Sequence, residues 1–146
     1  MAYRGRYKPK NSSKYDGDPT KIIYRSLLER RFMVYCDTNS SILKWSSEEI
    51  VVPYVSPLDS RWHRYFVDFW VQYRDSNGTL KSSLIEVKPL SQTKEPKRVP
   101  SGIKPTRRML TEIMTWGVNQ AKWQAAKEYC NDRKWDFKIL TEKDLT

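Results

Sequence analysis

Two acidic residues and one lysine interrupt two runs of strand-forming sequence near the middle of the chain. Asp68 lies in residues 64–70, and Glu86 and Lys88 lie in residues 83–89. Both runs are rich in aromatic and β-branched residues, which favour buried strands, where an unpaired charge is costly. Residues two apart on a strand face the same side, so Glu86 and Lys88 face one volume. Two carboxylates gathered beside an ammonium group are typical of a divalent-metal site with a cationic helper.

The turn between the two runs decides whether the carboxylates meet. It contains Asn77-Gly78, the strongest hairpin signal in short sequences. A two-residue loop would pair Asp68 with Val87 and leave the two carboxylates on opposite faces. A three-residue loop, with Gly78 in the left-handed region, would pair Asp68 with Glu86. The metal site therefore requires a loop with an odd number of residues.

Length and composition limit the class of protein. The chain has 146 residues, which suits one domain, and its 38% apolar and 13% aromatic content predicts a folded core. The net charge of +10 favours an anionic partner, and nucleic acid suits a domain this basic and aromatic. An anionic membrane surface is the weaker alternative, because no basic amphipathic helix accompanies a continuous apolar face. We therefore expect nucleic acid as the partner and no membrane.

Three further sequence features narrow the chemistry. The first ten residues lack the apolar run of a signal peptide, so we expect the chain to stay where it is made. Cys36 and Cys130 lack CxxC spacing, which predicts buried reduced thiols. His63 is the single histidine, so neither zinc nor serine-type chemistry is supported. The chain has no glycine-rich phosphate loop, and we expect no nucleotide cofactor.

The N-terminal third is predicted to hold an arm and a helix. Residues 1–18 form a basic, flexible arm that is either solvated or bound to phosphates through residues such as Arg4 and Arg6. Asp18-Pro19-Thr20 has the chemistry of a helix start, which predicts a helix to about Tyr35. Glu29 lies at the margin of the apolar face of this helix, so it either pairs at the surface or reaches inward.

The rest of the chain alternates short strands with a loop and a helix. Residues 42–45 and 50–54 are predicted strands, the second stopped by Pro53. The hairpin follows at residues 62–74 and 80–88. A helix is predicted from Arg107 to about Asn131, either continuous or broken near Gly117, and a strand at residues 135–140 completes the domain.

A basic loop over residues 91–108 separates the hairpin from the last helix. Proline and glycine exclude regular structure there, and the loop is either a solvated insertion or a surface for phosphates. Lys122 interrupts the apolar stripe of the helix, so it either extends to water or faces the site. Six cations of the loop oppose one acid: Lys94, Lys97, Arg98, Lys104, Arg107 and Arg108 against Glu95.

The ordered set Glu29, Asp68 and Glu86-Val87-Lys88 resembles the PD-(D/E)xK nuclease superfamily, although Val67 stands where its first motif usually has proline. The closer resemblance is to the head-completion nucleases of T-even-type tailed bacteriophages, which are related to TnsA-type transposon endonucleases. It covers most of the chain from about residue 8. The matching stretches are Tyr24-Arg25-Ser26 and residues 44–49, 53–57, 63–69, 85–89 and 118–123.

The resemblance implies an α/β fold with a restriction-endonuclease-like αβββαβ core, a mixed sheet flanked by helices, in one domain over residues 19–146. It implies a DNA nuclease that processes packaged DNA before heads join tails, located in the virion head or neck and in the host cytoplasm during assembly, with portal or neck proteins as partners. A related endonuclease in transposition, restriction or repair, or a non-catalytic connector, remains an alternative.

The implied chemistry assigns a role to each site residue. Asp68, Glu86 and the Val87 carbonyl would hold Mg²⁺, for which Mn²⁺ could substitute, since hard cations prefer oxygen ligands. Such an ion polarises a phosphate and acidifies water. Glu29 would bind through water or recruit a second ion, and Lys88 would offset charge that develops on the phosphate.

Overall fold

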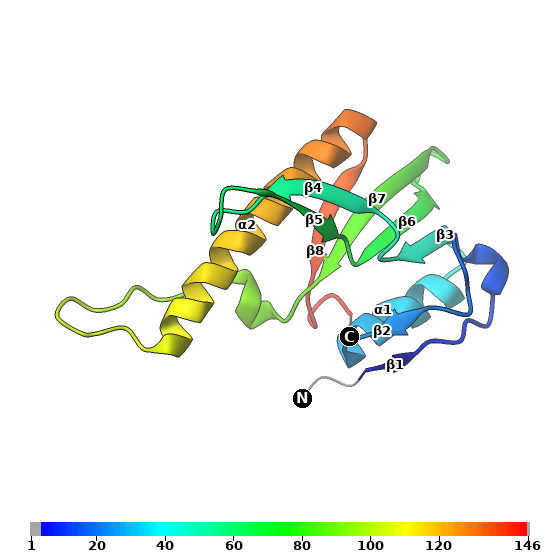
Figure 1. The fold of residues 1–146 in the computed structure, drawn as a ribbon. Helices are drawn as coiled ribbons and strands as arrows, with labels where there is room; N and C mark the ends of the chain where they lie inside the picture. Colours follow the sequence, from blue (N-terminus) through cyan, green and yellow to red (C-terminus); the bar gives the residue numbers. More distant parts are fainter. Residues whose placement is uncertain (1–3, 146) are drawn as a thin grey trace.

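The computed structural model describes residues 4–145 and centres on a four-stranded sheet in the order β3-β6-β7-β8. Neighbouring strands in this sheet are antiparallel except β7 and β8, which are parallel, so the sheet is mixed. The fold is therefore the predicted α/β arrangement of one mixed sheet with flanking helices (Figure 1). The sheet strands are β3 (Ile42–Ser47), β6 (Phe69–Arg74), β7 (Leu80–Val87) and β8 (Asp136–Leu140).

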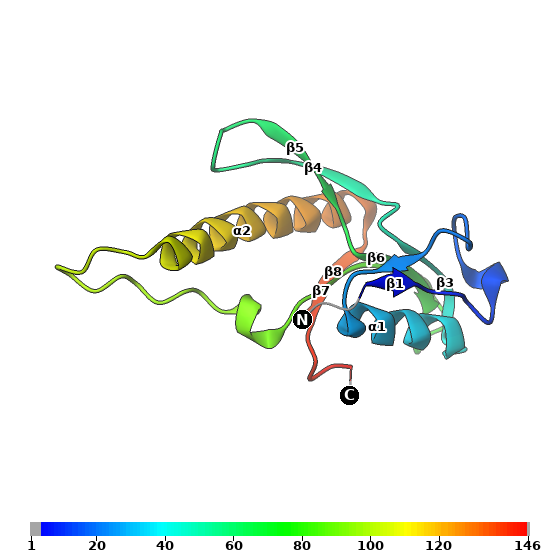
Figure 2. The same ribbon diagram turned by 60° about the horizontal axis from the view of Figure 1, so that its bottom comes forward.

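Two helices cover opposite faces of the sheet (Figure 2). Helix α1 (Leu27–Thr38) packs through Phe32, Met33 and Cys36 on the face that carries Phe69 and Ile85. Helix α2 (Arg107–Arg133) packs its C-terminal half on the other face. A hairpin of β4 (Val51–Val55) and β5 (Trp62–Phe66) lies over α2 and shares its core. Both cysteines are buried and reduced, as predicted.

The hairpin between β6 and β7 has the register that the metal site requires. Arg74 lies opposite Leu80 and Phe69 opposite Ile85, and the pairing continues through the N–H of Asp75, which donates to the Thr79 carbonyl at 2.9 Å. Three residues form the loop, and Gly78 has φ of 76°. The prediction of an odd loop with glycine in the left-handed region is confirmed.

Residues 62–74 do not form the single continuous strand that the sequence predicts. Its first part, β5, pairs with β4 in a separate two-stranded sheet, and its second part, β6, joins the central sheet. Val67 and Asp68 lie at the bend, where the Glu48 N–H donates to the Asp68 carbonyl at 3.1 Å. Strand β4 also continues through Pro53, because a strand with one unpaired edge tolerates a residue that cannot donate there.

The start of the first helix also differs from the prediction. Asp18 accepts hydrogen bonds from the Thr20 N–H at 2.9 Å and hydroxyl at 2.6 Å in an isolated turn. The chain then forms β2 (Ile23–Tyr24), and α1 begins after Ser26, whose hydroxyl accepts from the Glu29 N–H at 3.1 Å. Ser26-x-x-Glu29 is a capping-box pattern, and it overrides the aspartate-proline signal upstream.

Residues 4–18, predicted to be a flexible arm, pack on the domain. Strand β1 (Gly5–Arg6) pairs with β2, and the turn η1 (Ser12–Lys14) follows. Tyr7 and Tyr15 are buried against Trp45. The aromatic residues interleaved with the basic ones are therefore core residues, because their rings fill one side of the sheet's edge. No helix within residues 4–145 is long and apolar enough to cross a membrane.

Helix α2 is continuous through Gly117 and extends beyond the body of the domain. The turn η2 (Leu90–Thr93) and the segment 94–106 run out beside its first half, and together they form a projection in both views (Figures 1 and 2). Arg107 and Arg108 lie in the first turn of α2, not in the loop. Residues 90–117 make up this projection.

Candidate active site

The Asp68 and Glu86 side chains come together at the end of the hairpin. The register of β6 and β7 ends with Phe69 opposite Ile85, Asp68 and Glu86 are the next residues on the two sides, and the charge of Glu86 acts on Asp68. Both side chains therefore face the side of the sheet that carries α2, like Trp70 and Leu84. The Val87 N–H donates to Asp68 Oδ2 at 2.8 Å, which fixes this carboxylate beside β7.

The pKa of Asp68 is raised well above its usual value of 3.8. Burial is the largest cause, and the negative charge of Glu86 is the next; Glu29 adds a smaller effect. The hydrogen bond from the Val87 N–H acts in the opposite direction. A carboxylate pair of this kind repels itself and favours a proton or a cation in the space that the two groups share.

Two neighbours hold the Glu86 carboxylate, which is 4% exposed. The Tyr65 hydroxyl donates to Oε1 at 2.8 Å, and the Lys88 Nζ lies 3.6 Å from Oε2. Burial and the Glu86 charge raise the pKa of Tyr65, so its phenol remains a hydrogen-bond donor at neutral pH. Lys88 thus faces the same volume as Glu86, as the spacing of two residues predicts.

Glu29 approaches the pair from the N-terminus of α1. Its Oε2 accepts from the Arg25 N–H at 2.7 Å. Burial raises the pKa of Glu29, and the charges of Glu48 and Glu86 raise it further, although the hydrogen bond from Arg25 lowers it. Glu29 is half-buried, and it combines the contact with Arg25 with a charge that also acts on Asp68. Glu48, at φ of 55°, forms an ion pair with Arg25.

Lys122 is half-buried on α2. Its Nζ lies 5.8 Å from the centroid of the Tyr54 ring and 5.5 Å from that of Tyr65. Aromatic faces attract an ammonium group, so the lysine is held above the tyrosine that binds Glu86. This places a second cation on the α2 side of the acid pair.

The predicted DNA-binding residues fall into two separate groups. Arg4 and Arg6 are exposed at the N-terminal strand, beside β2. The other group is exposed on the projection, which begins two residues after Lys88. Its members are Lys94, Lys97, Arg98, Lys104, Arg107 and Arg108.

Sequence reasoning missed Tyr65, Arg25 and Glu48 as parts of the site. Tyr65 is buried on the inner side of β5, and only the bend after β5 brings its hydroxyl to Glu86. The capping pattern at Ser26 was the signal that could have placed Arg25 next to Glu29. No signal in the sequence indicated that Glu48 follows a strand adjacent to Asp68.

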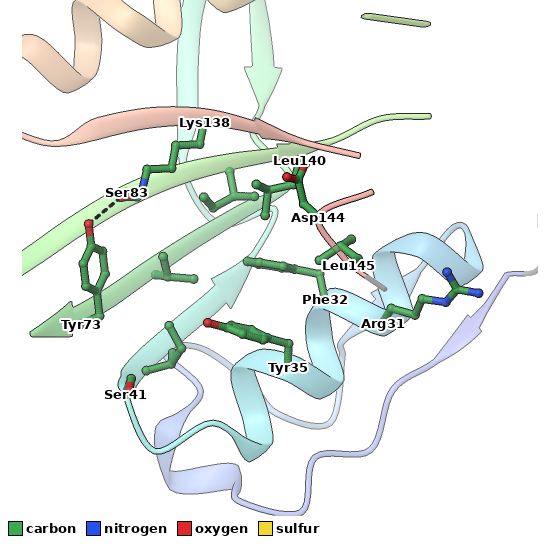
Figure 3. A pocket seen from close by; sticks show the side chains of 13 residues that line it. Arg31, Phe32, Tyr35, Ser41, Tyr73, Ser83, Lys138, Leu140, Asp144 and Leu145 are labelled. Carbon is green, nitrogen blue, oxygen red and sulfur yellow. Dashed lines mark hydrogen bonds between the residues drawn. The ribbon is translucent and has the colours of Figure 1, made fainter. Parts of the chain in front are cut away.

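A pocket of about 520 Å³ on the α1 side of the sheet does not belong to this site (Figure 3). Phe32, Tyr35 and Ile85 line it, and the Tyr73 hydroxyl and the Ser83 hydroxyl approach to 3.5 Å at its edge. None of the acidic residues of the site lines it. Among residues 4–145, no group of three or more His, Cys, Asp or Glu side chains is arranged to hold a metal ion.

Comparison with known proteins gives two matches. Residues 39–142 match the family model described as the N-terminal domain of TnsA-like endonucleases. The chain is also 42% identical to a protein of enterobacteria phage T4 named head completion nuclease, over 99% of this chain and 95% of that protein. The family match includes Asp68, Glu86 and Lys88, whereas Glu29 precedes it.

Proposed function

The chain belongs to the family of TnsA-like endonucleases, and from this membership we propose that it is a metal-dependent deoxyribonuclease of phage head completion. The observation that carries the proposal is the apposed pair Asp68 and Glu86 with Lys88 beside it. The name of the T4 relative supports the biological setting, in which packaged DNA is processed before heads join tails.

The donor set at the acid pair fits a hard divalent cation. Asp68 and Glu86 supply carboxylate oxygens, and burial and the charge of Glu86 raise the pKa of Asp68, so a cation between the two groups would relieve their repulsion. Mg²⁺ needs only one or two protein carboxylates beside water and phosphate oxygens. The Val87 carbonyl would add a ligand and Glu29 would act through water; Mn²⁺ fits the same oxygens. When bound, the ion supplies Lewis-acid polarisation of the phosphate and a lowered pKa of water.

The chain's own residues bind and orient the reacting groups. The Lys88 ammonium, 3.6 Å from Glu86, is placed to orient an attacking water and to offset negative charge that develops on the scissile phosphate. The Val87 N–H and the Tyr65 hydroxyl hold the two carboxylates in fixed orientations. These contacts come from the protein itself and would hold the carboxylates in position for the reaction.

The DNA substrate would also bind to residues outside the acid pair. Exposed lysine and arginine side chains on the projection would bind phosphates without reading sequence. Arg4 and Arg6 would add phosphate contacts at the N-terminal strand. Lys122 would add a cation near Tyr65. We place the protein at the virion head or neck, with portal or neck proteins as neighbours, and in the host cytoplasm during assembly.

Two other functions are compatible with the fold. The match to the TnsA-like model favours a related endonuclease of transposition, restriction or repair. Identity to the phage nuclease over nearly the whole chain favours head completion instead. A non-catalytic connector is disfavoured, because a structural role gives no reason to keep a repelling acid pair beside a lysine.

Cleavage of plasmid and linear DNA tests the proposal. The purified protein should cut DNA with Mg²⁺ and should not cut it in EDTA. Asp68→Ala should abolish the activity, whereas Asp132→Ala, at an exposed position near the end of α2, should not. Cleavage that persists in Asp68→Ala would contradict the proposed site.

A further inference from the structure

A groove runs between residues 91–100 and the first half of α2. It has a volume of about 910 Å³, which lies in the range of about 300–1,000 Å³ for ligand-binding pockets. Lys94, Lys97 and Arg98 line its loop side, and Trp116 and Asn119 line its helix side. The loop wall carries three cations and one acid, Glu95, and the helix wall carries an aromatic ring, an amide and the acid Glu112.

Trp116 is a rigid element of this groove. Its ring packs edge-to-face on Trp123, with centroids 6.3 Å apart and planes at 87°. Trp123 is buried under the β4–β5 hairpin, so Trp116 has a fixed support while part of its own ring remains in the groove. An aromatic ring held in this way is a stacking platform for a nucleobase.

Asn119 lies one helical turn further along α2, toward the acid pair. The residue is only 7% exposed, and its side chain makes no hydrogen bond within residues 4–145. Its amide nitrogen and oxygen are not among the enclosed polar atoms that lack a partner, and the residue lines the groove, so the amide is open to the groove. Its donor and acceptor together match the edge of a base.

The inner end of the groove approaches the acid pair along two short connections. On the loop side, Ser91 follows Lys88 by three residues. On the helix side, Lys122 follows Asn119 by one turn and lies over Tyr65, which donates to Glu86. A DNA strand that lies along the groove would therefore lead toward the Asp68 and Glu86 carboxylates.

We propose that this groove binds one unpaired strand of DNA, with a base on Trp116 and at the Asn119 amide, and with phosphates at Lys94, Lys97 and Arg98. A base inside a duplex is covered on both faces and paired at its edge, so only an unstacked base can use the tryptophan and the amide. The inference rests on the proposed function for its ligand, and it narrows the substrate to DNA with a single-stranded segment.

Binding without cleavage tests the proposal separately from nuclease activity. Anisotropy of a fluorescein-labelled oligothymidine of about 12 nucleotides, and of a duplex of the same length, is measured in EDTA. Trp116→Leu should weaken binding of the single strand by about 10-fold or more and binding of the duplex by less than about 2-fold. Trp62→Leu, which changes a tryptophan that is 71% exposed on β5 and outside the groove, is the matched control and should change neither.

A second measurement uses the unmodified protein, because Trp116→Leu also removes a contact with Trp123. A single strand that carries 5-iodouracil is photo-crosslinked, and the attached residue is identified by mass spectrometry. Attachment at Trp116 supports the groove. Attachment confined to Trp62 or to other residues outside the groove, or an equal loss of single-strand and duplex binding in Trp116→Leu, overturns it. Single-strand binding through Trp116 in a protein that never cleaves DNA would instead overturn the proposed function alone.

Discussion

The Asp68 and Glu86 carboxylates repel each other, and their neighbours hold them in place despite that repulsion. The Val87 N–H donates a hydrogen bond to Asp68, the Tyr65 hydroxyl donates one to Glu86, and Lys88 offsets part of the charge. A structural ion pair would instead match each acid with a base. The arrangement is therefore poor for stability and suited to a cation, which is how catalytic acid pairs differ from salt bridges.

Neutralising either acid should distinguish a cation-binding site from a structural salt bridge. Asp68→Asn and Glu86→Gln keep the oxygen that accepts each hydrogen bond, and they remove the like-charge repulsion. We expect cleavage to be abolished while the melting temperature is unchanged or higher in scanning calorimetry. Lower melting temperatures with activity retained in both variants would identify a structural salt-bridge site instead.

Tyr65 is a positioning residue for Glu86. Tyr65→Phe removes only the hydroxyl that donates at 2.8 Å, and leaves the ring against Lys122. Loss of such an outer hydrogen bond costs about 10–100-fold in metal affinity or activity. We expect kcat to fall by that factor, with the Mg²⁺ concentration for half-maximal rate raised, while Tyr73→Phe, on the far face of the sheet, keeps both values. An unchanged Mg²⁺ dependence would contradict the positioning role.

At the scale of elements, the sequence predicted the part of the site that lies on one hairpin. The requirement that Asp68 meet Glu86, together with Asn77-Gly78, predicted the odd loop that β6 and β7 show. It did not predict the break between β5 and β6, because alternation along a strand carries no information on which sheet the strand joins. Tyr65 was missed for that reason.

The N-terminal segment shows a second limit of prediction from sequence. Its basic composition favours disorder, but one buried carboxylate organises it: Asp37 of α1 accepts from the Tyr7 hydroxyl at 2.7 Å and from the N–H groups of Lys10 and Asn11 at 2.8 and 2.9 Å. Burial acts to raise the pKa of Asp37, yet these hydrogen bonds lower it below its usual value of 3.8. Contacts between residues so distant in sequence cannot be derived from local pattern.

Asp37→Asn should therefore loosen this segment. The loss of charge-assisted hydrogen bonds predicts a decrease of about 1.5–3 kcal/mol in the free energy of unfolding at pH 7. Because the folded pKa of Asp37 is lowered, its contribution is fully present above the unfolded value of 3.8 and is lost as pH falls below it. The difference between wild type and variant in urea unfolding should thus shrink below about pH 4.

Asp132→Asn is the matched control for that measurement. This aspartate is exposed, and its side chain makes no hydrogen bond within residues 4–145. The control should change stability by less than about 0.5 kcal/mol. If Asp37→Asn behaves like the control, or if amide exchange of residues 5–15 is not accelerated, Asp37 does not anchor the segment.

At the scale of the whole molecule, the net charge of +10 is distributed so that the projection carries a dense group of cations beyond the acid pair. Phosphate contacts of this kind give affinity that depends on salt and not on sequence. The projection extends away from the sheet in both views. Its exposed charges are the reason why composition alone predicted an anionic partner.

Charge reversal on the projection tests that role. Arg107→Glu with Arg108→Glu should weaken binding equally on unrelated DNA sequences. Each lost phosphate contact should lower the slope of log K against log salt by about 0.9. Lys81→Glu with Lys127→Glu makes the same change in net charge at exposed positions away from the projection and should leave the slope unchanged. Loss of binding to one sequence only would indicate base readout in place of phosphate binding.

We propose that Asp68 and Glu86 form the metal centre of a nuclease. Anomalous scattering from crystals soaked in Mn²⁺ tests this most directly, with Asp68→Asn crystals as the comparison. We expect an anomalous peak bounded by the Asp68 and Glu86 carboxylates in the wild type, and no peak there in the variant. A protein whose cleavage requires Mn²⁺ but whose only peak lies away from these carboxylates would contradict it.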